Sequence, residues 1–157
     1  MKSMYFSLVY SKLIYCVTIW GSTVDSQLNR VQIAQNRVFR SMMKLRKYDS
    51  VREIYVNLKI LRFKQIFEFF SALLIFKFSN LSYSKAVFRR VNEVHGRITR
   101  AAEYDIFLIT PRISQVLNSA IYKCPLYYNS LPNYIKQSNS INEFKGKLKF
   151  YILQTYQ

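Results

Sequence analysis

Apolar side chains recur with helical spacing along most of the chain. Dense apolar positions in residues 4–20 predict a first helix that Gly21 ends. Asp25 is placed to cap a second helix that runs to about Leu45. Residues 62–80 are apolar on nearly every side, which is typical of a buried core helix.

The predicted second helix is amphipathic, because at about 100° per residue its apolar and basic side chains separate onto opposite sides. Ile33 departs from this pattern on the basic side. Gln35 lies within the apolar arc, where burial would require hydrogen-bond partners. The apolar side holds Leu28, Val31, Ala34, Val38, Phe39, Met42 and Leu45. The basic side holds Arg30, Arg37, Arg40, Lys44 and Lys47.

The basic stripe favours a nucleic-acid-binding role for this helix. A row of cations can follow a phosphate backbone, since each neutralised phosphate releases counterions. The predicted contacts are therefore all five basic residues of the stripe, with Arg37, Arg40 and Lys44 as the first candidates. A solvated surface without a ligand is the other interpretation of the same pattern.

Two capping boxes, Ser50 with Glu53 and Ser140 with Glu143, predict the start of two further helices, because each serine and glutamate can satisfy free backbone amides reciprocally. Apolar residues then follow both boxes at helical spacing. These segments add to the helical content expected from the first half of the chain.

The second half of the chain is less regular. Residues 104–113 predict a short strand, and residues 118–128 fit either a strand or a helix. The sequence thus predicts a mainly α fold in a single unit over residues 1–157. It leaves room for one small β-hairpin around residues 104–124.

Charge is the strongest feature of the composition. The chain has 24 Lys and Arg against 8 Asp and Glu, a net charge of +16. Such an excess favours a polyanionic partner, with nucleic acid the first candidate and an anionic membrane surface the second. The codon bias of AT-rich DNA is a further explanation of the same charge.

No catalytic or metal-binding constellation stands out. The acids are scattered, and the closest pair, Glu103 and Asp105, is expected to form a solvated turn. His95 stands alone, and Cys16 and Cys124 are expected to be reduced, buried thiols. The glycines are too widely separated to form a phosphate-binding loop. We expect no catalytic residue, no metal, no cofactor and no small-molecule substrate.

The apolar start of the chain lacks the cleavage site of a signal peptide. The longest apolar run, residues 66–76, is too short to span a bilayer. We therefore expect an intracellular protein, nuclear or cytoplasmic and not secreted, for which a membrane is the less favoured partner.

Five short motifs follow one another along nearly the whole chain. They resemble, in type, order and spacing, the C-terminal end of the reverse transcriptase of non-LTR retrotransposons, particularly the jockey-like group. The chain has Tyr128 where that family usually has a tryptophan before Asn129. The motifs are YSKLIY at residues 10–15 with WG at 20–21, LNRVQIAQNRVFR at 28–40, LKIL at 58–61, YKCPLYYNSLP at 122–132 and SINEFKGKL at 140–148.

This resemblance implies the thumb and the following segment of an RNA-directed DNA polymerase, present as a truncated copy without palm, fingers or endonuclease. In that family the thumb is a helical unit that grips the primer–template duplex, and the catalytic carboxylates lie in the palm. The implied partners are an RNA–DNA hybrid or duplex nucleic acid, bound through its phosphate backbone, and the missing palm domain. Two alternatives remain open: a translated element remnant without a selected function, and a basic membrane-surface protein.

Overall fold

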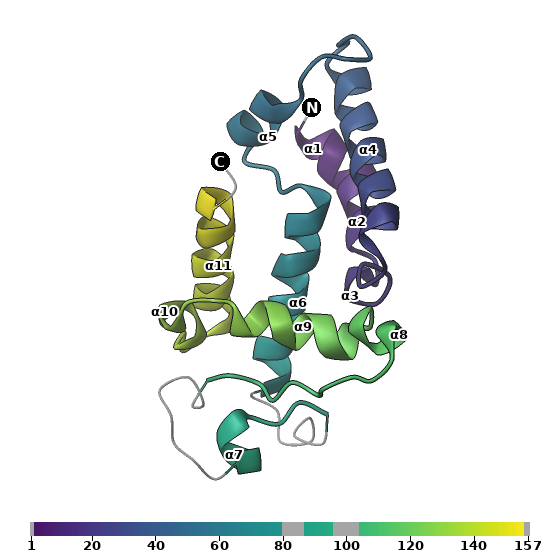
Figure 1. Ribbon diagram of the computed structural model, residues 1–157. Helices are drawn as coiled ribbons and strands as arrows, with labels where there is room; N and C mark the ends of the chain where they lie inside the picture. The colour runs from purple at the N-terminus through teal and green to yellow at the C-terminus, as the bar shows by residue number, and fades with distance from the viewer. Residues whose placement is uncertain (1, 80–86, 96–103, 156–157) are drawn as a thin grey trace.

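Helices make up most of the part of the chain that the computed structural model describes, which is residues 2–79, 87–95 and 104–155 (Figure 1). The predicted mainly α fold is confirmed. The longer helices are α4 (Asp25–Met42), α5 (Arg52–Leu58), α6 (Phe63–Ser79), α9 (Ala120–Asn129) and α11 (Ile141–Thr155). The shorter elements are α1 (Lys2–Tyr5), the π-helical turn η1 (Phe6–Tyr10), α2 (Ser11–Ile14), α3 (Val17–Trp20), α7 (Val91–His95), α8 (Ser114–Leu117) and α10 (Asn133–Lys136).

Helix α6 is the centre of the fold. It packs against α2, α3 and α4, and also against α9 and α11. Figure 1 shows α4 and α11 on opposite flanks of α6, with α9 crossing it. Phe63, Ile66, Phe67 and Ile75 of this helix are all fully buried. A helix that is apolar on nearly every side is stable only when it is surrounded, so the sequence pattern of residues 62–80 dictates this central position.

A second, smaller apolar cluster lies beneath α5. It joins Tyr5 of α1 and Phe39 of α4, whose rings stack at 4.7 Å, to Ile54 and Tyr55 of α5. Gln35, which the sequence places within the apolar arc of α4, is indeed buried. Its Nε2 donates to the hydroxyl of Tyr5 at 2.8 Å and to the carbonyl of Leu61 at 3.1 Å. The predicted hydrogen-bond partners are thus present for Nε2, whereas Oε1 has no partner among the described residues.

The first predicted helix is interrupted near its C-terminal end. The chain remains helical through Ile14, but Cys16 adopts a left-handed conformation with φ of 49°, and α3 starts afresh at Val17. Cys16 is therefore exposed, so the expectation of a buried thiol is wrong there. Cys124 is buried in the main core, and burial raises its pKa.

The Trp20-Gly21 motif closes this N-terminal unit onto α6. The indole N–H of Trp20 donates to the carbonyl of Tyr15 at 2.7 Å, and its ring stacks on Phe63 at 4.9 Å. Gly21 is buried so closely against α6 that an added Cβ would lie 2.6 Å from the ring of Phe67. The glycine is thus required by close packing and not by a special backbone conformation.

The predicted β-hairpin around residues 104–124 is wrong. Helices α8 and α9 occupy residues 114–117 and 120–129, and the described residues show only an isolated antiparallel bridge between Arg90 and Ile106. Pro125 does not divide α9, because the buried side chains of Cys124, Pro125 and Tyr128 hold this helix against α6. Tertiary packing overrides the weak local preference.

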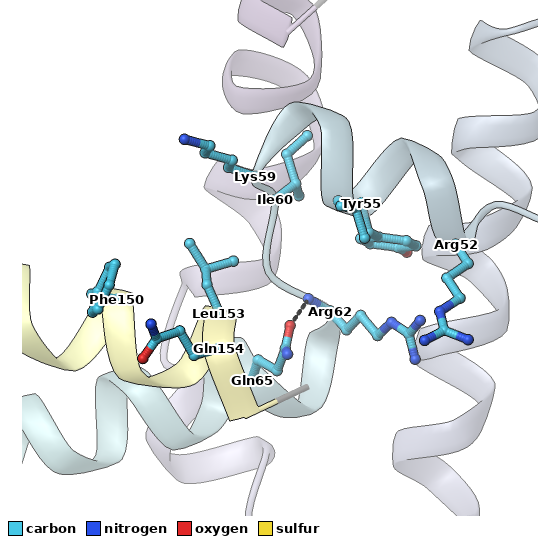
Figure 2. A pocket seen from close by; sticks show the side chains of 10 residues that line it. Arg52, Tyr55, Lys59, Ile60, Arg62, Gln65, Phe150, Leu153 and Gln154 are labelled. Carbon is cyan, nitrogen blue, oxygen red and sulfur yellow. Dashed lines mark hydrogen bonds between the residues drawn. The ribbon is translucent and has the colours of Figure 1, made fainter. Parts of the chain in front are cut away.

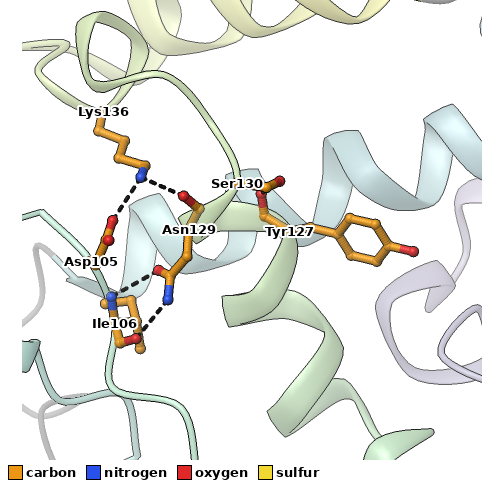
Figure 3. Close-up of polar contacts among 6 residues, drawn as sticks. All are labelled: Asp105, Ile106, Tyr127, Asn129, Ser130 and Lys136. Carbon is orange, nitrogen blue, oxygen red and sulfur yellow. Dashed lines mark hydrogen bonds and ion pairs between the residues drawn. The ribbon is translucent and has the colours of Figure 1, made fainter. Parts of the chain in front are cut away.

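A side chain takes the place of the missing strand partner (Figure 3). The amide of Asn129 accepts a hydrogen bond from the backbone N–H of Ile106 at 2.9 Å and donates to its carbonyl at 2.8 Å. Next to this pair, Lys136 Nζ donates to Asp105 Oδ1 at 2.7 Å and to the carbonyl of Asn129 at 2.8 Å. The Asn-Ser-Leu-Pro motif therefore anchors the extended segment to the helices. Asp105 pairs with Lys136, whereas its predicted neighbour Glu103 lies outside the described residues.

The two predicted capping boxes differ in outcome. At the start of α11, the N–H of Glu143 donates to Ser140 Oγ at 3.2 Å, while the Glu143 carboxylate accepts from the N–H of Asn139 at 3.0 Å. A hydrogen bond from Lys147 and this backbone N–H lower the pKa of Glu143. At the start of α5, Ser50 Oγ accepts from the N–H of Arg52 at 3.3 Å, so the predicted box is not formed.

Buried tyrosines make the fold sensitive to high pH. Burial raises the pKa of Tyr5 and of Tyr128 to about 12. In the unfolded chain a tyrosine hydroxyl has a pKa near 10. Between about pH 10 and 12 the unfolded chain therefore releases protons that the folded chain retains, and stability falls as pH rises.

On raising the pH we expect a cooperative loss of helical circular dichroism, with tyrosinate absorbance that appears at a higher pH than for free tyrosine. Tyr128→Phe, which keeps the ring, should move this transition to higher pH. An unchanged transition would contradict the assignment to Tyr128.

Candidate nucleic-acid interface

A polar network fixes α4 against α5 and the start of α6. Gln32 Nε2 donates to Asn36 Oδ1 at 2.9 Å and to the hydroxyl of Tyr55 at 3.1 Å, and that hydroxyl donates to Asn36 at 2.8 Å. Gln32 Oε1 accepts from the N–H of Phe63 at 2.9 Å and so caps α6. These bonds set the spacing of the three helices before any ligand binds.

A groove with a volume of about 620 Å³ lies along this network, between α4, α5 and the first turn of α6. Four cationic side chains line it: Arg40 from α4, Arg52 from α5, Arg62 just before α6 and Lys64 within its first turn. Asp25 is the acid among its lining residues. The groove therefore has a strong excess of positive charge, with neutral hydrogen-bonding groups such as Asn29 and Ser50 between the cations.

The position of Arg62 and Lys64 is informative. Cations at a helix N-terminus oppose the helix dipole, so they are unfavourable there unless an anion binds between them. In the described part of the chain, neither side chain forms an ion pair with a carboxylate. The guanidinium of Arg62 lies over the ring of Tyr55, 5.6 Å from its centroid, which holds it at the wall of the groove.

A second hollow opens beside the groove and shares four of its lining residues. Figure 2 shows Arg52 and Arg62 reaching beneath the ring of Tyr55 and, across the hollow, side chains of α11. The Arg62 backbone N–H donates to Gln65 Oε1 at 2.7 Å, so the turn carrying Arg62 is fixed. The hollow therefore adjoins the groove at these four shared residues, two of which, Arg52 and Arg62, are cationic.

The structure separates the five basic residues predicted from the helix pattern. Arg40 faces the groove, where its Nε donates to the carbonyl of Asp49 at 3.0 Å. Arg30 and Arg37 lie on the other flank of α4, beside Trp20.

Lys44 and Lys47 are not on the helix at all. Helix α4 ends at Met42, and Lys44 turns the chain with φ of 53°. Lys47 lies in the loop that follows, with its ammonium group 5.3 Å from the ring centroid of the exposed Tyr48. The prediction that the second helix carries both lysines is therefore wrong, and so is the extension of its apolar face to Leu45.

Sequence reasoning missed Arg52, Arg62 and Lys64, because they come from segments that only the fold brings together. One signal was present: two cations stand at the beginning of the most apolar helix, where the helix dipole disfavours them. Ile33, which the helical periodicity of the sequence places on the basic side of α4, is 49% exposed, in agreement with that prediction.

Other kinds of site find little support in the described residues. Within residues 2–79, 87–95 and 104–155 there is no group of three or more metal-ligating side chains. In the same ranges, no helix is both long and apolar enough to cross a bilayer. The side chain of His95 lies outside the described part.

Comparisons of the chain with protein-family models, with curated proteins and with solved structures find no match. The residues of the sequence motifs make contacts that hold the fold together. Trp20 and Gly21 pack on α6, and Asn129 forms hydrogen bonds with Ile106. The hydrogen bonds that connect α4 to its neighbours come from Gln32, Gln35 and Asn36.

Proposed function

We propose that this chain grips the phosphate backbone of a nucleic acid in the groove between α4, α5 and α6. In line with the motif resemblance, it would act as the non-catalytic C-terminal part of a retrotransposon RNA-directed DNA polymerase, with an RNA–DNA hybrid or a duplex as its ligand. The observation that supports this proposal is the convergence of Arg40, Arg52, Arg62 and Lys64 on one groove with a single acid in its lining.

Binding of this kind depends on charge and on groove shape, and it reads no sequence. Arginine guanidinium groups donate several hydrogen bonds to phosphate oxygens, and the N-terminal end of α6 adds its dipole. Hydrogen bonds among Gln32, Asn36 and Tyr55 already hold the helices around the groove in place. Binding therefore costs little conformational entropy of the protein. Each contacted phosphate releases counterions, so affinity should fall steeply with added salt.

The test compares two double variants that remove the same charge. Binding of the full chain to a labelled RNA–DNA hybrid is measured over a salt series for wild type, for Arg62→Ala/Lys64→Ala in the groove and for Arg30→Ala/Arg37→Ala on the outer flank. The logarithmic salt slope should become shallower by about 1.8 for the groove pair, since the slope is roughly 0.9 per phosphate contact. The outer pair should leave the slope nearly unchanged.

The outcomes separate the alternatives. A shallower slope only in the Arg30/Arg37 variant would move the interface to the outer flank of α4, which carries two of the five basic residues predicted from the helix pattern. Absence of hybrid binding at low salt, in a chain that unfolds cooperatively, would reject the proposal. Arg40 is left intact here because its bond to the carbonyl of Asp49 makes its loss a structural change as well.

A membrane surface is the second candidate, and one observation favours it. Met4, Leu8, Tyr15 and Ile19 of the N-terminal segment are each between 51% and 76% exposed, and such side chains could insert into the surface of an anionic membrane. Sedimentation with anionic vesicles in the absence of nucleic acid distinguishes this candidate. Leu8→Ser should abolish such binding and leave binding to the hybrid unchanged.

A further inference from the structure

The hollow beside the groove differs from it in chemical character. Arg52 and Arg62 lie beneath the ring of Tyr55 on one side of the hollow (Figure 2), and Lys59 lines it as a third cation. Helix α11 contributes Phe150, Leu153 and Gln154 on the other side (Figure 2), and Val56 and Ile60 complete the apolar lining. The lining residues include no acid. A ligand that fits both walls combines an anionic group with an apolar or aromatic body.

The volume of the hollow limits the size of the ligand that it can hold. Its volume of about 250 Å³ lies below the roughly 300–1,000 Å³ typical of pockets for drug-sized ligands. It suits one ring system with an attached charged group. Phe150, which lines the hollow, is 63% exposed, so its ring is accessible to a ligand.

The position of the hollow points to the source of the ligand. Groove and hollow share Arg52, Tyr55, Arg62 and Gln65, so a phosphate bound by Arg52 or Arg62 lies at the boundary between the two. A nucleotide whose phosphate is held by the shared arginines has the side chains of Phe150 and Leu153 of α11 in the same hollow to receive its base. Bases that leave a duplex stack readily on aromatic and guanidinium planes.

We propose that the hollow between α5 and α11 receives one unpaired base of a single strand that leaves the groove, with the adjoining phosphate held by Arg52 and Arg62. This assignment rests on the proposed binding of nucleic acid in the groove. It adds a specificity to that binding: a duplex carrying a single-stranded overhang is preferred to the same duplex with blunt ends.

The test uses the full chain and three RNA–DNA hybrids: blunt, with a short overhang, and with the same overhang carrying an abasic first position. We expect the overhang to tighten binding about 5-fold or more over the blunt and abasic forms, as one stacked base contributes. A fluorescent 2-aminopurine at the first overhang position should be quenched on binding. Phe150→Ala should remove this preference and keep the affinity for the blunt hybrid.

Tyr134→Ala is the matched control, because Tyr134 is also an exposed aromatic, at 54%, and lines neither depression. Gln154→Trp, which introduces a bulky ring at the mouth, should remove the preference by blocking entry. Equal binding of all three hybrids by wild type would overturn the inference and leave the groove proposal standing.

Loss of all hybrid binding would instead reject the groove proposal itself. Adenosine monophosphate is titrated in parallel. If it binds in a Phe150-dependent manner while the overhang has no effect, the hollow is a site for free nucleotides and the strand assignment is overturned.

Discussion

Replacing Lys136 with methionine is expected to lower the free energy of unfolding by about 3 kcal/mol, the lower end of the range for breaking a buried ion pair. The Lys136 side chain is only 2% exposed, and Asp105 is 21% exposed. Without the ammonium group, Asp105 keeps its charge in a poorly solvated place, and the carbonyl of Asn129 loses a donor. Chemical denaturation monitored by circular dichroism measures the change.

The matched control is Lys147→Met, which makes the same substitution in the exposed pair with Glu143 on α11. Both side chains there are more than a third exposed, and exposed pairs contribute little. The denaturation midpoint of this variant should therefore stay close to that of wild type. Asp105→Leu added to Lys136→Met should recover part of the loss, because no charge is then left unpaired. Equal effects of the two lysine variants would contradict the structural role of Lys136.

The second large effect is expected at Gly21, where substitution by alanine should lower the free energy of unfolding by about 1–3 kcal/mol. The new methyl group would collide with the carbonyl oxygen of Val17 and would lie 2.6 Å from Cδ2 of Phe67. Neither neighbour moves easily, since one is backbone and the other is a fully buried ring of α6. Thermal and chemical unfolding give the magnitude.

Gly146→Ala provides a control of opposite sign. Gly146 is exposed within α11, and nothing lies within 4 Å of the position of its added Cβ. Alanine there should stabilise the protein by about 1 kcal/mol through its higher helix propensity. Glycine-to-alanine substitution is thus expected to destabilise the protein at the crowded position 21 and to stabilise it at the open position 146. A destabilised Gly146→Ala variant, or a neutral Gly21→Ala variant, would show that the environment of that glycine has been misjudged.

Much of the helical framework could be predicted from periodicity, and the mispredictions have identifiable causes. Gln35 within an apolar arc correctly predicted a buried amide, and its nitrogen has two partners, whereas its oxygen has none among the described residues. The end of α4 was placed too late, because Lys44 has no sequence signature of the left-handed turn it makes. Residues 118–128 were ambiguous because Pro125 seemed to divide them, whereas burial against α6 maintains the helix.

The candidate groove was only partly predictable. Arg40 belongs to the basic stripe that helical periodicity predicts. Periodicity alone could not show that Arg40 lines the groove, whereas Arg30 and Arg37 lie on the other flank of α4. Arg52 and Arg62 come together through the packing of α5 on α4 and the capping of α6 by Gln32. Contacts between segments that are distant in the sequence cannot be predicted from the hydrophobic periodicity of a single sequence.

The anchoring of Ile106 by the side chain of Asn129 has a consequence for how the molecule opens. A strand within a sheet is held along its length by backbone hydrogen bonds. The segment around Ile106 is held instead by side chains of α9 and α10 and by the short bridge to Arg90, in which the N–H of Phe107 donates to the Arg89 carbonyl at 2.8 Å. Such a segment can detach as a local unit, at a free energy below that of global unfolding, while every helix stays folded. Because Ile106 is only 1% exposed, each detachment briefly uncovers the main core. We therefore expect the amides of this segment to exchange through local opening, at a lower free energy than the amides of the central helix α6.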